Sequence, residues 1–251
     1  MDRTFAETPA MFGAVHLGIL GAIALTLVLL FFVLRKRSEK ALLRLLFVLG
    51  VCMLSAEIWK QWFVHRYVYN GVRSMWFFPW QLCSMAMYVS TAAPFLKGKA
   101  RDAALVFLCT FSLVGALVAL AVPADMMRPQ ILLFAHSFLY HAVMLIEALI
   151  AVLLLTRRPR VSFLPALVLF CGMALVAEGI NLVSHAIIPS ITYQANMFYI
   201  TPFYPTTQPV FDVIAQRCGI AVEIVLYLGV IAAASCGLYR LWYALFRQKA
   251  V

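Results

Sequence analysis

Seven long apolar segments follow one another along this chain, and they constrain its fold more than any other feature. Each has about 20 residues or more, the length that a helix needs to cross a hydrocarbon layer about 30 Å thick. Backbone groups in hydrocarbon must be paired internally, and the segments lack the alternating pattern of barrel strands. The sequence therefore predicts an all-α integral membrane protein, a bundle of seven transmembrane helices. The expected spans are residues 13–34, 42–64, 76–95, 103–122, 131–155, 163–183 and 218–241.

The composition agrees with lipid as the main solvent. The chain is 65% hydrophobic and only 12% charged, against about 25% charged residues in soluble domains. No internal repeat or soluble domain interrupts the apolar segments, so residues 1–251 are expected to form one transmembrane domain. The first apolar run is too long for the core of a signal peptide and is expected to remain as a span.

Basic residues are distributed unequally between the two sides of the predicted bundle. Fourteen Lys and Arg residues lie after the first, third, fifth and seventh spans, five lie on the other side, and Lys60 lies within a span. Because positive residues near helix ends are retained in the cytoplasm, this predicts an N-terminus outside and a cytoplasmic C-terminus. The same clusters explain the net charge of +10, so nucleic-acid binding is not expected.

Polar and ionisable residues within the spans collect in the predicted outer half of the bundle. An ionisable group at mid-helix costs about 2.5–3.5 kcal/mol, so a cluster indicates a functional site. The alternative is structural: Glu57 and Lys60 form a helix-edge ion pair, and the other side chains hydrogen-bond neighbouring helices. The candidate residues are Glu57, Lys60, Gln81, Cys83, Ser84, His136, Tyr140, His141, Glu147, Glu178, Asn181 and His185.

Helical phase groups some of these residues. Glu178, Asn181 and His185 fall within about 60° of one another, so they predict one polar stripe on the sixth span. His136 falls within about 40° of Tyr140 and Glu147, whereas His141 points about 140° away from His136. Phase alone therefore favours His136 as the histidine that serves a site.

The longest connection, residues 184–217, is rich in aromatic residues and proline. Aromatic rings of this kind favour the membrane interface. Two interpretations remain open: a cap or re-entrant segment over an outer site, or an interfacial loop that only anchors the bundle.

Cys83 lies in the run Phe78-Pro79-Trp80-Gln81-Leu82-Cys83-Ser84, just inside the predicted outer interface. Pro79 can start a helix, and a thiol near a helix N-terminus is stabilised as thiolate, ready for nucleophilic attack. The alternative is that Cys83 is a small core residue. The six cysteines contain no CxxC pair, so neither a zinc site nor a thiol redox pair is suggested. No metal and no cofactor are expected.

Three motifs resemble those of a known group, the YwaF-like bacterial integral membrane proteins and the animal phospholipid acyltransferase transmembrane protein 164. They are Pro79 with Cys83, the run of residues 136–145, and the aromatic stretch of residues 196–202. The resemblance implies acyl transfer between phospholipids, with Cys83 as the acyl-accepting nucleophile and a histidine as base. The wording His-Ala-x-Met-Leu points to His141, whereas phase points to His136. A bacterial cytoplasmic membrane is the expected location.

We therefore expect an intramembrane acyltransferase or lipid hydrolase that acts on acyl lipids of the outer leaflet. Glu178, Asn181 or Gln81 would orient the base or bind the oxyanion. The main alternative is a proton-coupled transporter or lipid-binding protein that uses buried glutamates, Glu223 included. A haem or quinone protein is a third, since four histidines lie at one depth. Transport ranks second because the predicted cytoplasmic half is almost free of polar groups.

Overall fold

The computed structural model describes residues 4–72, 74–158 and 161–247. These residues form helices joined by loops, with one isolated bridge between Thr4 and Gln130, so the predicted all-α class is confirmed. Arg3, Arg73, Arg160 and Lys249, which entered the charge count, lie outside the described residues. The helices are α1 (Ala14–Leu34), α2 (Glu39–Phe63), α3 (Met85–Ala92), α4 (Gly98–Phe107), α5 (Leu113–Ala121), α6 (Ile131–Leu155), α7 (Leu164–Ile187), α8 (Phe211–Cys218) and α9 (Ile220–Arg247).

Six helices of the described chain are long and apolar enough to cross a membrane. A π-helical turn at Leu108–Ser112 joins α4 and α5 into one of these helices, and another at Val64–Val68 extends α2. The protein is therefore a multi-pass integral membrane protein. The six are residues 14–34, 39–68, 98–121, 131–155, 164–187 and 220–245.

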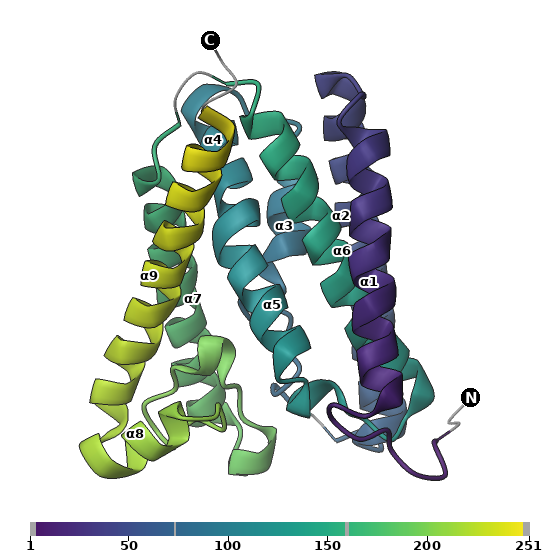
Figure 1. The fold of residues 1–251 in the computed structure, drawn as a ribbon. Coiled ribbons are helices and arrows are strands. Elements are labelled where there is room, and N and C mark those ends of the chain that lie inside the picture. The colour runs from purple at the N-terminus through teal and green to yellow at the C-terminus, as the bar shows by residue number, and fades with distance from the viewer. Residues whose placement is uncertain (1–3, 73, 159–160, 248–251) are drawn as a thin grey trace.

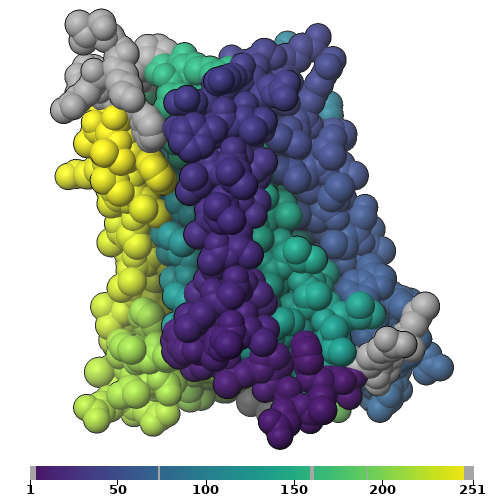
Figure 2. Space-filling view, turned by 45° about the vertical axis from the view of Figure 1, so that its right-hand side comes forward, coloured from purple at the N-terminus to yellow at the C-terminus, as the bar shows by residue number. Residues whose placement is uncertain are grey.

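The bundle has a central and a peripheral set of helices. Most residues of the helix 98–121 and of α6 are buried, whereas α1 and α9 are mostly exposed. Figure 2 shows α1, in purple, lying on the outside of the bundle along its whole length. Its exposed side chains include Leu25, Leu29 and Phe32. Exposed apolar side chains of this kind are expected where a helix faces lipid tails.

The two ends of the bundle differ in the chain segments they hold. In Figure 1, α1 begins at the lower end, where α8 and the loop before it also lie, while α4 begins and α9 ends at the upper end. Gly219 has a φ of +91°, a conformation that suits glycine, and it separates α8 from α9. The expected interfacial loop 184–217 thus contains a short helix.

The third predicted span, residues 76–95, contains only the eight-residue helix α3. Pro79 does not start this helix, which begins six residues later. The ring of Pro79 disfavours a helical conformation at Phe78, and Asn70 and Gly71 turn the chain with positive φ angles. The sequence Phe78 to Ser84 is consequently irregular, and Cys83 lies in the turn before α3.

Residues 77–94 nevertheless lie alongside α2 over most of its length. At one end, Gln61 donates a hydrogen bond to the Phe77 carbonyl. At the other, Arg101 donates to the Pro94 carbonyl and pairs with Glu39 at the start of α2. The rise from Glu39 to Gln61 is about 33 Å, close to the ~30 Å thickness of a hydrocarbon core.

Between those ends, α3 packs tightly on α2. A Cβ atom at Gly50 would come within 2.5 Å of the Ser90 and Thr91 hydroxyl oxygens. Only glycine leaves room for this close approach of the two backbones.

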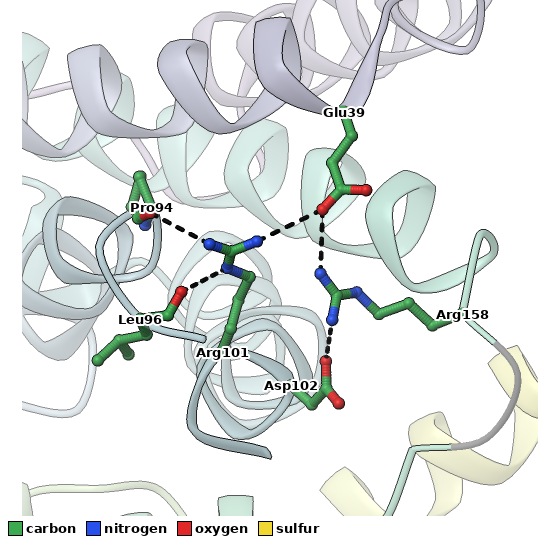
Figure 3. Close-up of polar contacts among 6 residues, drawn as sticks. All are labelled: Glu39, Pro94, Leu96, Arg101, Asp102 and Arg158. Atoms are coloured by element: carbon green, nitrogen blue, oxygen red, sulfur yellow. Dashed lines mark hydrogen bonds and ion pairs between the residues drawn. The ribbon is translucent and has the colours of Figure 1, made fainter. Parts of the chain in front are cut away.

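An ionic network ties four segments together at the upper end of the bundle (Figure 3). The Arg158 guanidinium contacts Asp102 Oδ1 at 2.6 Å and Glu39 Oε1 at 3.1 Å. Arg101 contacts the same Glu39 oxygen at 3.5 Å and donates to the carbonyls of Pro94 and Leu96. The network joins α2, the turn after α3, α4 and the turn after α6.

Candidate functional site

The C-terminal part of α2 carries a compact group of polar side chains. The Lys60 ammonium lies 2.8 Å from Glu57 Oε1, and the Gln61 amide donates to the same oxygen at 2.7 Å. Gln61 also donates to the Phe77 carbonyl and so fixes the irregular segment against α2. Glu57 is buried but has two partners, which is how a buried carboxylate is normally tolerated.

Cys83 lies beside this group, in the turn before α3. Its thiol is half-buried and close enough to Lys60 and Glu57 for both charges to act on it. The Ser84 N–H donates to the Gln81 carbonyl at 2.8 Å and closes the turn that carries Cys83. Cys83 is therefore a thiol held in a polar environment.

His136 and Tyr140 project from α6 toward α2. The His136 ring lies 5.9 Å from the Trp59 ring and is stacked on Tyr140 at 5.6 Å. Its Nε2 is buried and has no hydrogen-bond partner among the described residues. A neutral His136 can thus present an unoccupied nitrogen as a base.

His141 lies on the other side of Tyr140, with ring centroids 6.0 Å apart. Its Nδ1 is 2.7 Å from the Ser137 carbonyl, which can only accept, so Nδ1 carries the proton. Nε2 of the neutral ring then holds the lone pair. The Lys60 charge acts on both His136 and His141, so the structure brings both histidines close to the Cys83 region.

Glu147 lies deeper on α6, about 24 Å along the helix from its first residue. Its side chain is fully buried, and neither carboxyl oxygen has a hydrogen-bond partner among the described residues. Ser90 lies beside it, but the Ser90 hydroxyl donates to the Met87 carbonyl at 3.4 Å. Glu147 is therefore separate from the paired Glu57.

The segment Gln194–Thr201 folds back into the bundle, and almost all of its residues are buried. Two amide side chains hold its backbone. Gln81 donates to the Asn196 carbonyl at 2.7 Å and accepts from Phe198 N–H at 2.8 Å. Asn181 accepts from Met197 N–H at 2.6 Å and donates to the Met197 carbonyl at 3.2 Å. Gln194–Thr201, which we call the re-entrant segment, is thus packed into the bundle and held there by side chains of other elements.

The polar stripe of α7 faces this re-entrant segment. Asn181 also donates to Glu178 at 3.4 Å, and His185 is 3.0 Å from the Gln194 side-chain oxygen and stacked on Phe203. The stripe thus contacts the re-entrant segment, and among the described residues it forms no hydrogen bond to His136 or His141.

Tyr204 also supports the re-entrant segment. Its hydroxyl donates to the Ala195 carbonyl at 3.0 Å. Burial raises the pKa of Tyr204 to about 12, so this donor keeps its proton at neutral pH.

His16 has no free nitrogen for chemistry. Its Nδ1 accepts from Phe12 N–H at 3.1 Å, and its Nε2 donates to the Leu120 carbonyl at 2.9 Å. This histidine joins α1 to the end of α5 and is structural.

Sequence reasoning missed three side chains in this part of the bundle. Gln61 follows Glu57 by four residues, a helical spacing that could have identified it. Tyr199 in the re-entrant segment and Tyr227 on α9 lie near enough to Cys83 for the charge of a thiolate there to act on their hydroxyls. Tyr227 follows Glu223 by four residues, whereas Tyr199 gave no periodic signal.

No group of three His, Cys, Asp or Glu side chains in the described chain could hold a metal ion. Cys83 instead lies within range of the Lys60 and Glu57 charges, in the same part of the bundle as His136, Tyr140 and His141. These residues provide a thiol, two nitrogen bases and a hydroxyl donor in one region of the bundle.

Comparison with known proteins places the chain in a family. No curated protein and no solved structure matches it. Residues 11–242 match the family model of the TMEM164 family. The matched region contains all six long helices apart from the last three residues of the span 220–245. The chain therefore belongs to the TMEM164 family.

Proposed function

We propose that this protein is an intramembrane acyltransferase, or a lipid hydrolase, that uses Cys83 as nucleophile and a histidine of α6 as base. The observation that carries the proposal is that a half-buried thiol and two imidazoles, whose Nε2 atoms have no described hydrogen bond, all lie within range of the Lys60 charge. Both imidazoles flank Tyr140, which itself lies near Cys83. A thiol and a base in reach of each other are the elements of covalent catalysis.

The proposed reaction has two steps. The histidine Nε2 takes the thiol proton, and the sulfur forms a bond to the carbonyl carbon of a lipid ester. The carbon–oxygen bond of the ester then breaks, and the departing alcohol takes the proton from the histidine, leaving a thioester on Cys83. A lysolipid hydroxyl, or water in a hydrolase, repeats the sequence and releases the thiol.

Either histidine can serve as the base. The buried and unpartnered Nε2 of His136 and the helical phase of that residue favour His136. The Ser137 hydrogen bond that fixes the tautomer of His141 favours His141, since a second partner commonly orients a catalytic imidazole.

We further propose seven crossings, with residues 76–95 as the third, the N-terminus outside and the C-terminus in the cytoplasm. Two observations support this topology. Residues 77–94 extend beside α2 over most of its length, and basic residues are concentrated at the end that carries Arg101 and Arg158. The site would then face acyl lipids of the outer leaflet. The likeness to YwaF-like proteins suggests the cytoplasmic membrane of a bacterium.

The test is transfer of a labelled acyl chain from a phosphatidylcholine to a lysophospholipid by purified protein in lipid nanodiscs. We expect Cys83→Ala to abolish transfer and the essential histidine to be the one whose alanine variant loses about 10²-fold or more. A matched control is Cys109→Ala, because Cys109 is a buried cysteine on the central helix. Full transfer by Cys83→Ala would rule out the proposed nucleophile.

A proton-coupled transporter is the second candidate, and Glu147 is the observation that favours it. An ionisable group deep in a membrane helix with no described partner is a common feature of proton pathways. This candidate requires Glu147 for function and does not require Cys83.

A further inference from the structure

The Tyr140 hydroxyl is an unusual group in this bundle. Its side chain is only 7% exposed, yet the hydroxyl has no hydrogen-bond partner among the described residues. Buried tyrosine hydroxyls normally find a partner. Tyr88, Tyr204 and Tyr239 do so here, with the carbonyls of Pro79, Ala195 and Val161. An unpaired buried donor costs stability and therefore needs another explanation.

Tyr140 also lies where the proposed chemistry would occur. Its ring is stacked on His136 and meets His141 edge-on, so it separates the two candidate bases. It lies near enough to Cys83 for the charge of a thiolate there to act on the Tyr140 hydroxyl. The unused hydroxyl donor is thus close to both the nucleophile and the bases.

The amide side chains that sequence reasoning suggested for the oxyanion are already occupied. Gln81 uses its nitrogen and oxygen on Asn196 and Phe198. Asn181 uses both of its polar atoms on Met197. Both N–H groups of the Asn181 amide are in use, on Met197 and Glu178, and the Gln81 amide, which keeps one N–H, is fixed in place by its two bonds to the re-entrant segment.

We infer that the Tyr140 hydroxyl is the donor that stabilises the oxyanion formed when Cys83 attacks an acyl ester. This inference rests on the proposed function. A donor fixed in a water-poor site before the reaction stabilises the developing negative charge without reorganisation. The missing partner of Tyr140 in the resting protein would be the ester oxygen itself.

Tyr140 would act without changing its own protonation state. As the sulfur–carbon bond forms, the electron pair of the carbonyl double bond moves to oxygen, and the Tyr140 O–H donates a hydrogen bond to it. The pair returns when the bond to the alcohol breaks, and the alcohol takes its proton from the histidine. The hydroxyl ends as it began.

The test compares two reactions of the Cys83 thiol in wild type and Tyr140→Phe. Acylation by p-nitrophenyl palmitate passes through an oxyanion, whereas alkylation by iodoacetamide does not. We expect Tyr140→Phe to slow formation of the Cys83 thioester by about 10²-fold and to leave the alkylation rate unchanged. The melting temperature should not fall, because phenylalanine removes only an unpartnered hydroxyl.

Tyr239→Phe is the matched control, since its hydroxyl bonds the Val161 carbonyl on the turn before α7, away from Cys83. It should leave acylation unchanged. An unchanged acylation rate in Tyr140→Phe would overturn the inference while the proposed nucleophile stands. Equal losses in both reactions would also overturn it, because Tyr140 would then act on the thiol. Absence of a wild-type thioester would overturn the proposed function and this inference with it.

Discussion

At the scale of single residues, the buried carboxyls differ in how they are satisfied. Glu57 has Lys60 and Gln61 as partners, whereas both oxygens of Glu147 lack one among the described residues. The folded protein is destabilised when the partner of a paired buried charge is removed. An unpaired buried polar group already lowers the stability of the folded protein. Glu147 is therefore the residue whose substitution separates the two candidate functions.

We predict that Glu147→Leu raises the free energy of unfolding by about 1–3 kcal/mol, because leucine removes an unsatisfied polar group at similar volume. Thermal unfolding in detergent measures this effect. Acyl transfer should persist in this variant. Loss of stability would mean that the carboxyl has a partner, and loss of all activity would favour the transporter.

Lys60→Met is the corresponding test of the paired group. It leaves the buried Glu57 carboxylate with Gln61 as its remaining described partner. We predict a loss of about 3 kcal/mol, within the range for breaking a buried pair. The double variant Lys60→Met with Glu57→Gln should recover much of that loss, and no recovery would contradict a direct coupling between the two side chains.

At the scale of elements, the re-entrant segment is held by side chains distant in sequence. Gln81 precedes α3 and Asn181 lies on α7, and each forms two hydrogen bonds with the segment's backbone. Such a clamp replaces the hydrogen bonds that the segment would make to water.

Asn181→Ala should therefore destabilise the protein by about 2 kcal/mol, since it leaves buried backbone groups of Met197 unpaired. Gln216→Ala is the matched control, because Gln216 is an exposed amide on α8. Limited proteolysis should cut the region of residues 188–210 faster in Asn181→Ala only. Equal cleavage in both variants would contradict a clamping role.

The extent of sequence prediction also differs between elements. The sequence predicted a helix over residues 131–155, and α6 has these bounds, because a long apolar run both forms a helix and fills the bundle. The span at 76–95 was wrong as a continuous helix, since Pro79 and the contacts of Phe77 with Gln61 favour an irregular start.

The site was only partly predictable for a related reason. Helical phase brought His136 and Tyr140 together correctly, because both lie on one helix. It could not reveal that Gln81 contacts Phe198, 117 residues away, since contacts between distant segments leave no periodic signal. The sequence therefore suggested Gln81 and Asn181 as groups that orient the base or bind the oxyanion, whereas both amides bind the backbone of the re-entrant segment.

At the scale of the whole molecule, the proposed topology gives each end of the bundle a side of the membrane. Cys218 is exposed at the junction of α8 and α9, and Lys99 lies in the first turn of α4 at the other end. With Cys218 as the sole cysteine, a membrane-impermeant maleimide should label intact cells. A sole cysteine introduced by Lys99→Cys should react only after permeabilisation, and the reverse pattern would contradict the orientation.

The central claim is a covalent acyl intermediate on Cys83, and intact-protein mass spectrometry tests it most directly. Purified protein would be quenched in acid after incubation with a phosphatidylcholine of defined acyl chains. We predict a mass increase of one acyl group, located at Cys83 by peptide analysis, removed by hydroxylamine and absent from Cys83→Ala. Lipid remodelling by a wild-type protein that carries no adduct, or an adduct that persists in Cys83→Ala, would contradict the account.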